Sequence, residues 1–430
     1  MTQAISESDP TPKKEVNPAL KVTTQIPVNY LKRLIPIGQL PTQELQKLEI
    51  RIAHFKPGGV IFHRGELTEL LPYIAKGKVY LETGDGNGYE ITTQTFKALY
   101  PLSSEQQHQM TAIAKSDVSI IYVPNIALKR SNQLNINPLL ANDDTPDQLK
   151  ENFFFNAFSD YFKQGKLVVP TLPDVAIRLR SAMQKDISIG DAVKIVNMDP
   201  VVASRLIQMV NSPMYRSALP ISNCHDAVNR LGLNITRNLV TGICMRNLYQ
   251  SKHKNISEQI HNQWLQSIRV SSISQTLAAL TRKANPDEAL LAGLIHNIGA
   301  VPVLIFADSL PETAYSQEDL EMCIATTQNH IGLEILKRWQ FPEALLNIPM
   351  TVQNWYYDSG KHLTLTDIVL LARFHSLLGT PARQKLPPIN TLPAFQKLGD
   401  NTLTADMSLQ LLQNAKQQIS ETMNLFSGAL

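Results

Sequence analysis

The chain has few cysteines and no concentration of charge of either sign. Only three of its 430 residues are cysteines, Cys224, Cys244 and Cys323, and they form no C-x-x-C pair. This argues against a disulfide framework or a cysteine zinc site, and it favours reduced thiols in the core of a cytoplasmic protein. Forty basic and 37 acidic residues leave a formal net charge of +3. Because no stretch is strongly basic, we expect no binding to nucleic acid.

Long apolar runs are also scarce, with one exception. Residues 289–307 carry no charged side chain apart from the titratable His296, and their length is that of a membrane span. Gly293, Gly299 and Pro302 interrupt the run, and no positive flank marks an orientation. The segment therefore predicts a buried helix followed by a second short buried helix, and no membrane insertion.

Composition divides the chain into four segments. Residues 1–25 are polar and predict a disordered tail, unlike a signal or transit peptide. Residues 26–125 alternate short apolar stretches with glycine turns, which predicts a small β-roll or barrel. Residues 126–165 predict a linker and an aromatic docking helix, and residues 166–430 predict an all-α domain with further C-terminal helices. The expected fold class is a multidomain chain, with the β domain first.

Helix signals place several elements more closely. Pro41 and Thr42 predict the start of a helix over Gln43–Arg51. Asp199 as N-cap and Pro200 in the first turn predict the start of another. Further helices are expected over 153–162, 286–298, 330–339, 365–378 and 408–425.

The helical half resembles a known family in six separated motifs. These are Leu172-Pro173, Met198-Asp199-Pro200, Val210-Asn211-Ser212-Pro213, Ala227-Val228-Asn229-Arg230-Leu231-Gly232, Trp264-Leu265-Gln266-Ser267 and Ala292-Gly293-Leu294-Ile295-His296-Asn297-Ile298-Gly299. They occur in the order seen in HDOD domains, all-helical bacterial signalling domains related to the HD phosphohydrolases. The resemblance covers about 166–380 and implies a regulatory or scaffolding module without hydrolytic activity. It implies structural roles for Asp199, Pro200, Asn211, Ser212, Leu231, Gly232 and Trp264.

The resemblance also implies where catalytic relatives hold a metal. Gln266 stands in the place of a first histidine, and His296-Asn297 in the place of a His-Asp pair. His330 is retained, whereas Gln353-Asn354 replaces a later pair of histidines. Since an amide oxygen binds a divalent cation poorly, we expect no metal, no cofactor and no catalytic residue. The four positions predict a polar pocket instead: His296, Asn297, Gln266 and His330.

Two histidines invite simpler interpretations. His225-Asp226 is an intact His-Asp pair outside the expected metal-bearing helix, and it is interpreted as a solvated or helix-capping pair. His296, in an apolar helix, is interpreted as a packed, hydrogen-bonded core histidine rather than a ligand.

The N-terminal segment resembles cyclic-nucleotide-binding-like domains. The similarity lies in Pro57-Gly58-Gly59-Val60-Ile61-Phe62, Gly65, Tyr73-Ile74 and Gly77-Lys78-Val79. Such domains hold the cyclic phosphate with a Gly-Glu segment and a nearby Arg. Between Thr92 and Asp117 there is neither Arg nor Gly, so only Lys97 or His108 could contact an anion. A fold without bound nucleotide is the expectation.

Three functions follow. The first is a non-enzymatic bacterial signal-transduction or regulatory scaffold that acts through protein partners and has a possible small-molecule or nucleotide ligand. The second is a divergent metal-dependent phosphohydrolase acting on a nucleotide or cyclic dinucleotide, in which Asp287, Glu288 or Glu334 compensates for Asn297. The third is a cyclic-nucleotide-responsive receptor.

Overall fold

The computed structural model divides the chain into two units, residues 1–133 and 134–430. It describes residues 21–22, 26–84, 86, 88–133, 139, 149, 151–212, 214–215, 219–249, 254–398, 403 and 409–427. Within the segment expected to be a disordered tail, Lys21 and Val22 form a short strand, and the remainder lies outside the described residues.

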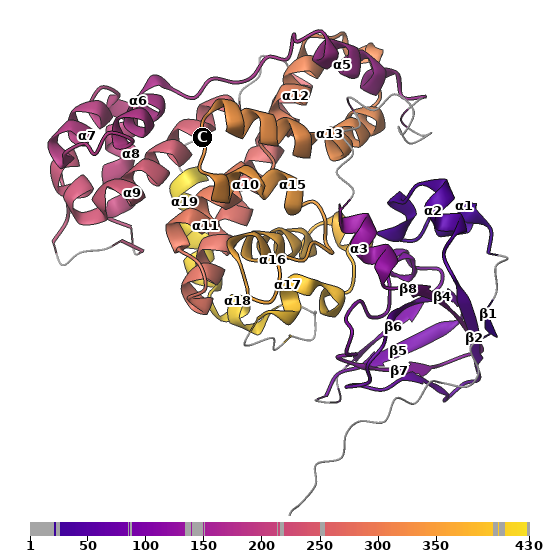
Figure 1. Cartoon of the computed structure of the whole chain (residues 1–430). Helices are drawn as coiled ribbons and strands as arrows, with labels where there is room; N and C mark the ends of the chain where they lie inside the picture. The colour runs from indigo at the N-terminus through magenta and orange to yellow at the C-terminus, as the bar shows by residue number, and fades with distance from the viewer. Residues whose placement is uncertain are drawn as a thin grey trace, which may run out of the picture. The chain divides into compact units, whose positions relative to one another are not determined.

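Two antiparallel four-stranded sheets build the first unit (Figure 1). The strands are β1 (Lys21–Val22), β2 (Arg51–Phe55), β3 (Val60–Phe62), β4 (Leu70–Lys76), β5 (Lys78–Glu82), β6 (Gly88–Thr92), β7 (Thr111–Ala114) and β8 (Val118–Pro124). One sheet has the order β1-β2-β8-β4 and the other β3-β7-β5-β6. This arrangement confirms the predicted β-roll.

The apolar residues of the strands supply the core of this unit. In β7 buried and half-buried residues alternate, the pattern of a strand with one face inward. Strand β8 lies between β2 and β4, and four consecutive residues, from Ile120 to Val123, are buried. Ile74, Val79, Leu81 and Ile120 are each at most 1% exposed and belong to one apolar cluster.

One helix prediction in this unit is wrong at its end. The helices here are α1 (Val28–Leu31), α2 (Thr42–Gln46), α3 (Ile126–Gln133) and the 3-10 turns η1 (Ile37–Gln39) and η2 (Phe96–Leu99). Helix α2 stops at Gln46, whereas the prediction extended to Arg51. Arg51 instead opens β2 and pairs with Tyr122 of β8. The backbone of Arg51 finds its hydrogen-bond partners in a strand distant in sequence, and this pairing outweighs the local helix propensity of the segment.

The second unit is helical in its described residues, apart from one isolated bridge between Leu403 and Leu409. Its main helices are α5 (Phe153–Lys163), α6 (Asp174–Met183), α7 (Ile189–Val196), α8 (Pro200–Val210), α9 (Cys224–Met245), α10 (Lys254–Thr281), α11 (Pro286–Ile295), α12 (Ala300–Asp308), α13 (Gln317–Arg338), α16 (Leu365–Leu378) and α19 (Lys416–Ser427). Shorter elements are η3 (Arg246–Leu248), η4 (Glu312–Ala314), α14 (Glu343–Leu346), α15 (Ile348–Thr351), η5 (Pro381–Lys385), η6 (Ile389–Thr391), α17 (Pro393–Gln396) and α18 (Gln410–Asn414). The predicted all-α domain is therefore confirmed.

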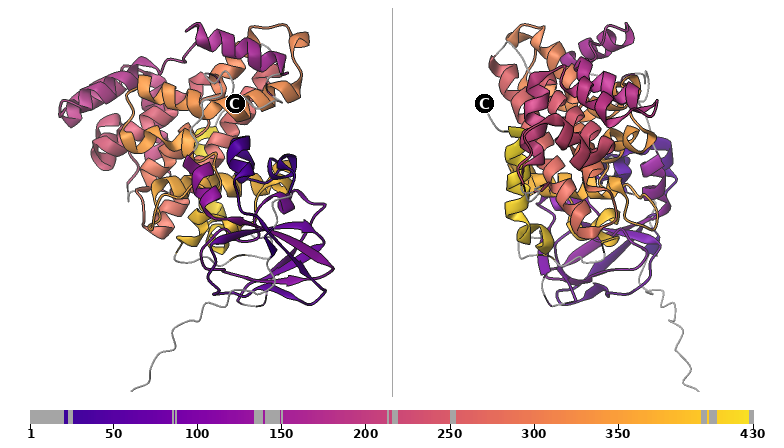
Figure 2. Two further views of the ribbon diagram at one scale, coloured as in Figure 1. Left: turned by 45° about the vertical axis from the view of Figure 1, so that its right-hand side comes forward. Right: turned by 90° about the vertical axis from the view of Figure 1, so that its left-hand side faces the viewer.

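Helix α10 is the centre of this unit and packs on α11, α16 and α19. Helices α6, α7, α8 and α9 pack on one another and form a lobe, from which α9 continues to α11 (Figures 1 and 2). Helix α5 packs on α13, and the ring centroids of Phe154 and Phe158 lie 5.6 and 5.4 Å from that of Phe306 in α12.

The long apolar run of the sequence forms two helices, α11 and α12, with a break at residues 296–299. By length and composition, residues 286–308 could cross a membrane, but 89% of the most apolar 18-residue stretch within them is buried inside the helical unit. The run therefore packs as core. The three cysteines are free and buried in the same unit.

Candidate functional site

Asn297 follows α11 and faces α10 across a closed set of hydrogen bonds. Its Oδ1 accepts from the hydroxyl of Ser267 at 2.6 Å and from that of Tyr249 at 3.4 Å. Its Nδ2 donates to the backbone carbonyl of Gln263 at 3.1 Å and to the Gln263 side-chain oxygen at 2.9 Å. Both ends of the amide thus have hydrogen-bond partners. Position 297 therefore suits a side chain that accepts at one end and donates at the other, as an amide does.

His296 lies beside it and is 1% exposed. Its Nδ1 lies 2.7 Å from the backbone oxygen of Gly293, so this nitrogen carries the proton and donates. Nε2 is buried with no partner among the described atoms. Burial, with a smaller contribution from the positive charge of Arg373, lowers the pKa of His296 to about 3, although the bond to Gly293 opposes the shift, so the imidazole is neutral.

Glycines around these residues let four helices approach closely. A Cβ on Gly293 would lie 2.4 Å from the Ser271 Cα in α10. A Cβ on Gly299 would lie 1.8 Å from the backbone oxygen of Gln328 in α13, and one on Gly332 would lie 2.7 Å from the Cβ of Pro349 in α15. The glycines of the Ala292–Gly299 motif therefore serve packing, because any side chain there would meet backbone.

Arg373 is a residue near this site that the sequence analysis missed. It lies half-buried on α16, with its guanidinium 4.3 Å from the centre of the Trp355 ring. Nη1 donates to the backbone oxygen of Val352 at 3.0 Å, in the segment where catalytic relatives are expected to carry paired histidines. A single Arg within the apolar run of 365–378 was the signal available. Its charge acts on His296, and a fixed cation here opposes a second one.

The other predicted pocket residues lie on different helices. Gln266 is half-buried on α10, and the described hydrogen bonds from that helix to Asn297 come from Gln263 and Ser267. His330 is half-buried on α13, and its Nδ1 lies 3.1 Å from Asn329 Oδ1. The described contacts join neither of them to His296. Both described surface hollows are lined by other residues.

Two of the acids proposed to compensate for Asn297, Asp287 and Glu334, have other partners. Asp287 accepts from the Tyr215 hydroxyl at 2.5 Å, and burial raises the pKa of its carboxyl. It lies in the first turn of α11, nine residues before His296, which is about 13 Å along a helix. Glu334 pairs with Lys337 at 3.4 Å at the surface. Among the described residues, no three His, Cys, Asp or Glu side chains are grouped as a metal could require.

Residues with expected structural roles lie mainly in caps and turns. Asp199 Oδ1 accepts from the backbone N–H groups of Val201 and Val202 at the start of α8, with Pro200 in the first turn. Asn211 accepts from the backbone N–H of Ile221 at 2.8 Å and donates to its carbonyl at 2.7 Å.

Three further motif positions lie within α9 and α10, and a fourth, Ser212, follows α8. Gly232 adopts a φ of 77° inside α9, which kinks the helix, and Leu231 before it is buried. Trp264 is 5% exposed and packs 5.1 Å from the Tyr249 ring. Ser212 is buried, and its Oγ has no partner among the described atoms.

His225 and Asp226 lie exposed in the first turn of α9. His225 Nδ1 lies 3.7 Å from Asp226 Oδ1, and Asn223, the N-cap, accepts from the backbone N–H of Asp226.

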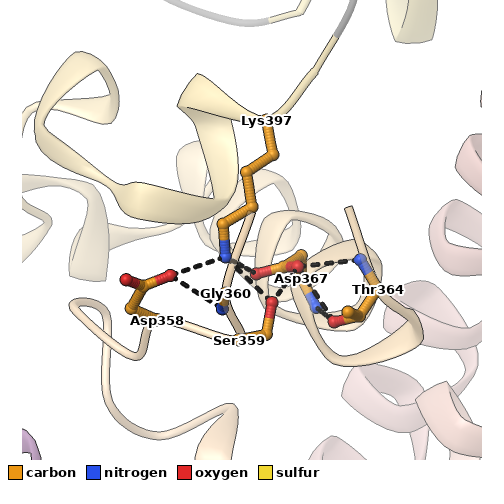
Figure 3. Close-up of polar contacts among 6 residues, drawn as sticks. All are labelled: Asp358, Ser359, Gly360, Thr364, Asp367 and Lys397. Atoms are coloured by element: carbon orange, nitrogen blue, oxygen red, sulfur yellow. Dashed lines mark hydrogen bonds and ion pairs between the residues drawn. The ribbon is translucent and has the colours of Figure 1, made fainter. Parts of the chain in front are cut away.

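A buried ion pair fixes the start of α16, the helix that carries Arg373 (Figure 3). Lys397 Nζ lies 3.2 Å from Asp367 Oδ1, and the two side chains are 8% and 0% exposed. Asp367 Oδ2 accepts from the backbone N–H and hydroxyl of Thr364 and from the hydroxyl of Ser359. Asp358, 62% exposed, adds a second carboxylate 3.0 Å from Lys397. The Thr364-x-x-Asp367 spacing is the capping-box signal that could have predicted this start.

In the first unit, the side chains proposed to contact an anion are otherwise engaged. His108 is 4% exposed, stacks 3.8 Å from Phe62 and lies 2.8 Å from the Ser103 hydroxyl. Burial lowers the pKa of His108 to about 4, so it is neutral at neutral pH. Lys97 Nζ lies 5.5 Å from the centre of the Tyr89 ring.

Comparison with known proteins agrees with this fold. A protein from Shewanella amazonensis SB2B, provisionally named a metal-dependent phosphohydrolase, has a solved structure with 27% identity and a TM-score of 0.55, covering 63% of this chain and 97% of that one. An uncharacterized protein of Treponema pallidum (strain Nichols) is 25% identical over 197 residues, which is 42% of this chain and 36% of that relative. The chain thus spans well under half the length of that relative.

A further structure covers the N-terminal part. It is a protein of Geobacter metallireducens GS-15, provisionally named as cyclic-nucleotide-binding, with 16% identity and a TM-score of 0.21, covering 26% of this chain and 85% of that one.

The helical unit thus contains a domain of the class related to the HD phosphohydrolases. Residues 169–354 match the model of the HDOD family, and this part of the chain is an HDOD domain.

Proposed function

We propose that this protein is a non-enzymatic regulatory or scaffold protein of a signal-transduction pathway. In it, a β-roll unit without bound nucleotide is joined to an HDOD module that acts through protein partners. Three free, buried thiols suit a reducing compartment, so the cytoplasm is the proposed location. The single observation that carries the proposal is the hydrogen-bonded state of Asn297.

The Asn297 amide is held as an amide. Its Nδ2 donates to two oxygens of Gln263, and its Oδ1 is directed at the hydroxyls of Ser267 and Tyr249. A metal at this position would have to displace those donors and would gain only a neutral oxygen. A divalent cation needs anionic or imidazole ligands to compensate for the loss of its water.

The charges nearby support the same conclusion. His296 is the imidazole that could bind a metal, but it is wholly enclosed and one positive group, Arg373, already acts on it. A doubly charged cation beside a fixed guanidinium is repelled, and burial strengthens that repulsion. The proposed role is therefore the presentation of a surface to partners rather than turnover of a substrate.

The competing function is a divergent phosphohydrolase. What favours it is the likeness to the Shewanella protein, at 27% identity over 63% of this chain. It requires a bound metal, whereas the scaffold does not. The two functions are therefore distinguished by metal content.

The test uses the full chain after incubation with manganese, iron or zinc and removal of free metal. We expect elemental analysis to find far less than one metal per chain, and a panel of nucleotides and cyclic dinucleotides with manganese to remain intact. Retention of about one or two metals per chain, lost in His296→Ala but kept in the exposed control His225→Ala, would contradict the proposal. Calorimetry with cyclic AMP, cyclic GMP and cyclic di-GMP tests the receptor alternative, and we expect no heat of binding.

A further inference from the structure

A hollow of about 200 Å³ opens on the helical unit, away from the residues discussed above. It is lined by Arg180, Met183, Gln184, Arg237, Gln340 and Pro342. These residues come from α6, α9 and the turn that follows α13. Its two charged lining residues are both arginines.

Arg180 is buried with few partners. It is 9% exposed, and the Phe341 ring covers its guanidinium, whose carbon lies 3.7 Å from the ring centre. Nη2 reaches the Thr241 hydroxyl at 3.5 Å, whereas Nε is buried without a partner among the described atoms. Burying a guanidinium is costly unless an anion or several acceptors compensate for the loss of water. The described neighbours supply one neutral oxygen and one ring.

Arg237 adds a second cation to the same hollow. It is half-buried, and its Nε and Nη2 both point to Asn238 Oδ1 at 3.4 Å, a neutral acceptor. No described carboxylate lies within ion-pair distance of either arginine, and Glu288 acts on Arg237 only from farther away. The two guanidinium groups repel each other, and burial and this repulsion lower the pKa of Arg180 to about 10.

The backbone of the hollow is strained at one lining residue. Gln340 follows α13 with a φ of 56°, a conformation that favours glycine at the end of a helix. Glycine would fit here without strain, but it would remove the amide that lines the hollow. This left-handed turn ends α13, where the backbone N–H of Phe341 donates to the carbonyl of Leu336 at 3.0 Å.

We propose that this hollow binds the phosphate group of a small phosphorylated molecule. Two planar guanidinium groups offer forked N–H donors that match a phosphate, and a dianion compensates for two cations where a carboxylate compensates for one. The exposed amides of Gln184 and Gln340 can add neutral donors, and Met183 and Pro342 can contact the part that carries the phosphate. A hollow of about 200 Å³ accommodates one phosphate and a portion of its carrier. The site is independent of the metal question, because none of its residues surrounds His296.

The test is calorimetric titration of the full chain with inorganic phosphate and with pyrophosphate, at constant ionic strength adjusted with sodium chloride. We expect saturable binding at about millimolar concentration or tighter, at one site per chain. Arg237→Gln should weaken the affinity about tenfold, the loss typical of one charged hydrogen-bonding group. Arg178→Gln is the matched control, because it removes the same charge from an exposed position of α6 and should leave the affinity unchanged.

Stability of the protein without ligand separates a binding role from a structural one. Arg237→Gln should leave the melting temperature unchanged or raise it, because it removes a repelling charge. Gln340→Gly should raise it by relieving strain, yet bind phosphate less tightly. The proposal is overturned if phosphate does not saturate, if acetate at the same ionic strength binds equally well, or if Arg178→Gln weakens binding as much as Arg237→Gln.

Discussion

Two regions of the helical unit differ in how far their polar groups are paired. One is the Asn297 cluster, formed by Asn297 with Gln263, Ser267 and Tyr249, and the other is the arginine hollow, lined by Arg180 and Arg237. At Asn297 both ends of the amide have partners on α10 or Tyr249, and glycines bring the surrounding helices into contact. Arg180 and Arg237 line a hollow, and the described hydrogen-bond acceptors of their guanidinium groups are neutral.

The difference indicates where this domain can still accept a ligand. A site whose donors and acceptors are already paired gains little from a bound ion, since each new bond replaces an existing one. A site with surplus donors and a cavity gains directly from an anion. Similarity to an enzyme family directs attention to the first region, whereas the physical chemistry favours the second.

The contrast between the two regions assumes that pairing a buried polar group matters for stability. The buried Asp367–Lys397 ion pair gives the largest test of that assumption. We expect Lys397→Met to lower the free energy of unfolding by about 3 to 5 kcal/mol, because the fully buried Asp367 loses its cation. Urea unfolding followed by circular dichroism measures the change. The double variant Asp367→Asn with Lys397→Met should recover much of the loss, and no recovery would mean that the pair is not the cause. Lys194→Met, at an exposed pair, is the control and should change stability little.

A change in pH tests the enclosed state of His296. The pKa of His296 is lowered to about 3 in the folded protein and is about 6.5 when unfolded. The unfolded chain therefore binds a proton as the pH falls below about 6.5, while the folded chain does not until about 3. Stability from this group is complete above 6.5 and is lost progressively below it, by about 2 kcal/mol between pH 7 and pH 5.

The measurement is urea unfolding of wild type and His296→Leu at the two pH values. The loss of unfolding free energy between pH 7 and pH 5 should be smaller in His296→Leu than in wild type by about 2 kcal/mol. His225→Leu, at an exposed histidine, should keep the wild-type pH dependence. An unchanged dependence in His296→Leu would show that the imidazole is accessible in the folded state, and the Asn297 region would no longer count as closed.

The substitution Asn297→Asp has the smallest expected effect on stability, and it tests whether position 297 requires a donor as well as an acceptor. A carboxylate keeps the bonds from Ser267 and Tyr249 but faces the two oxygens of Gln263, to which the amide donates. We expect a loss of about 1 to 2 kcal/mol at neutral pH, measured by urea unfolding against Asn234→Asp, an exposed position of α9. The deficit relative to wild type should shrink at lower pH, where a protonated acid can donate. A stabilised variant that also acquires a metal would reverse the assignment of this site.

Much of the fold could be predicted from local patterns. Glycine turns and alternation predicted the β-roll, and Asp199-Pro200 predicted the start of α8. Arg51 was misassigned because its partner, Tyr122, is 71 positions away and no local signal reports that pairing. The break at Ala415 between α18 and α19 was missed for the lack of a proline or glycine there.

The candidate site was less predictable. Comparing motifs one position at a time identified His296 and Asn297, but which neighbours they contact depends on how α10 and α16 pack against α11. Gln263 and Ser267, rather than Gln266, meet Asn297, and Arg373 reaches the region from a helix more than 70 positions further along the chain.

The amino-acid sequence by itself determined the two-part organisation, the helical class of the second unit and the neutral side chain at position 297. These depend on periodicity, on turn residues and on residue identity, all of which are local. Only the tertiary structure decided that the Asn297 amide is saturated and that Arg180 and Arg237 share a hollow. Hydrogen-bond satisfaction and charge compensation depend on groups brought together from distant parts of the chain, and no local pattern specifies those distances.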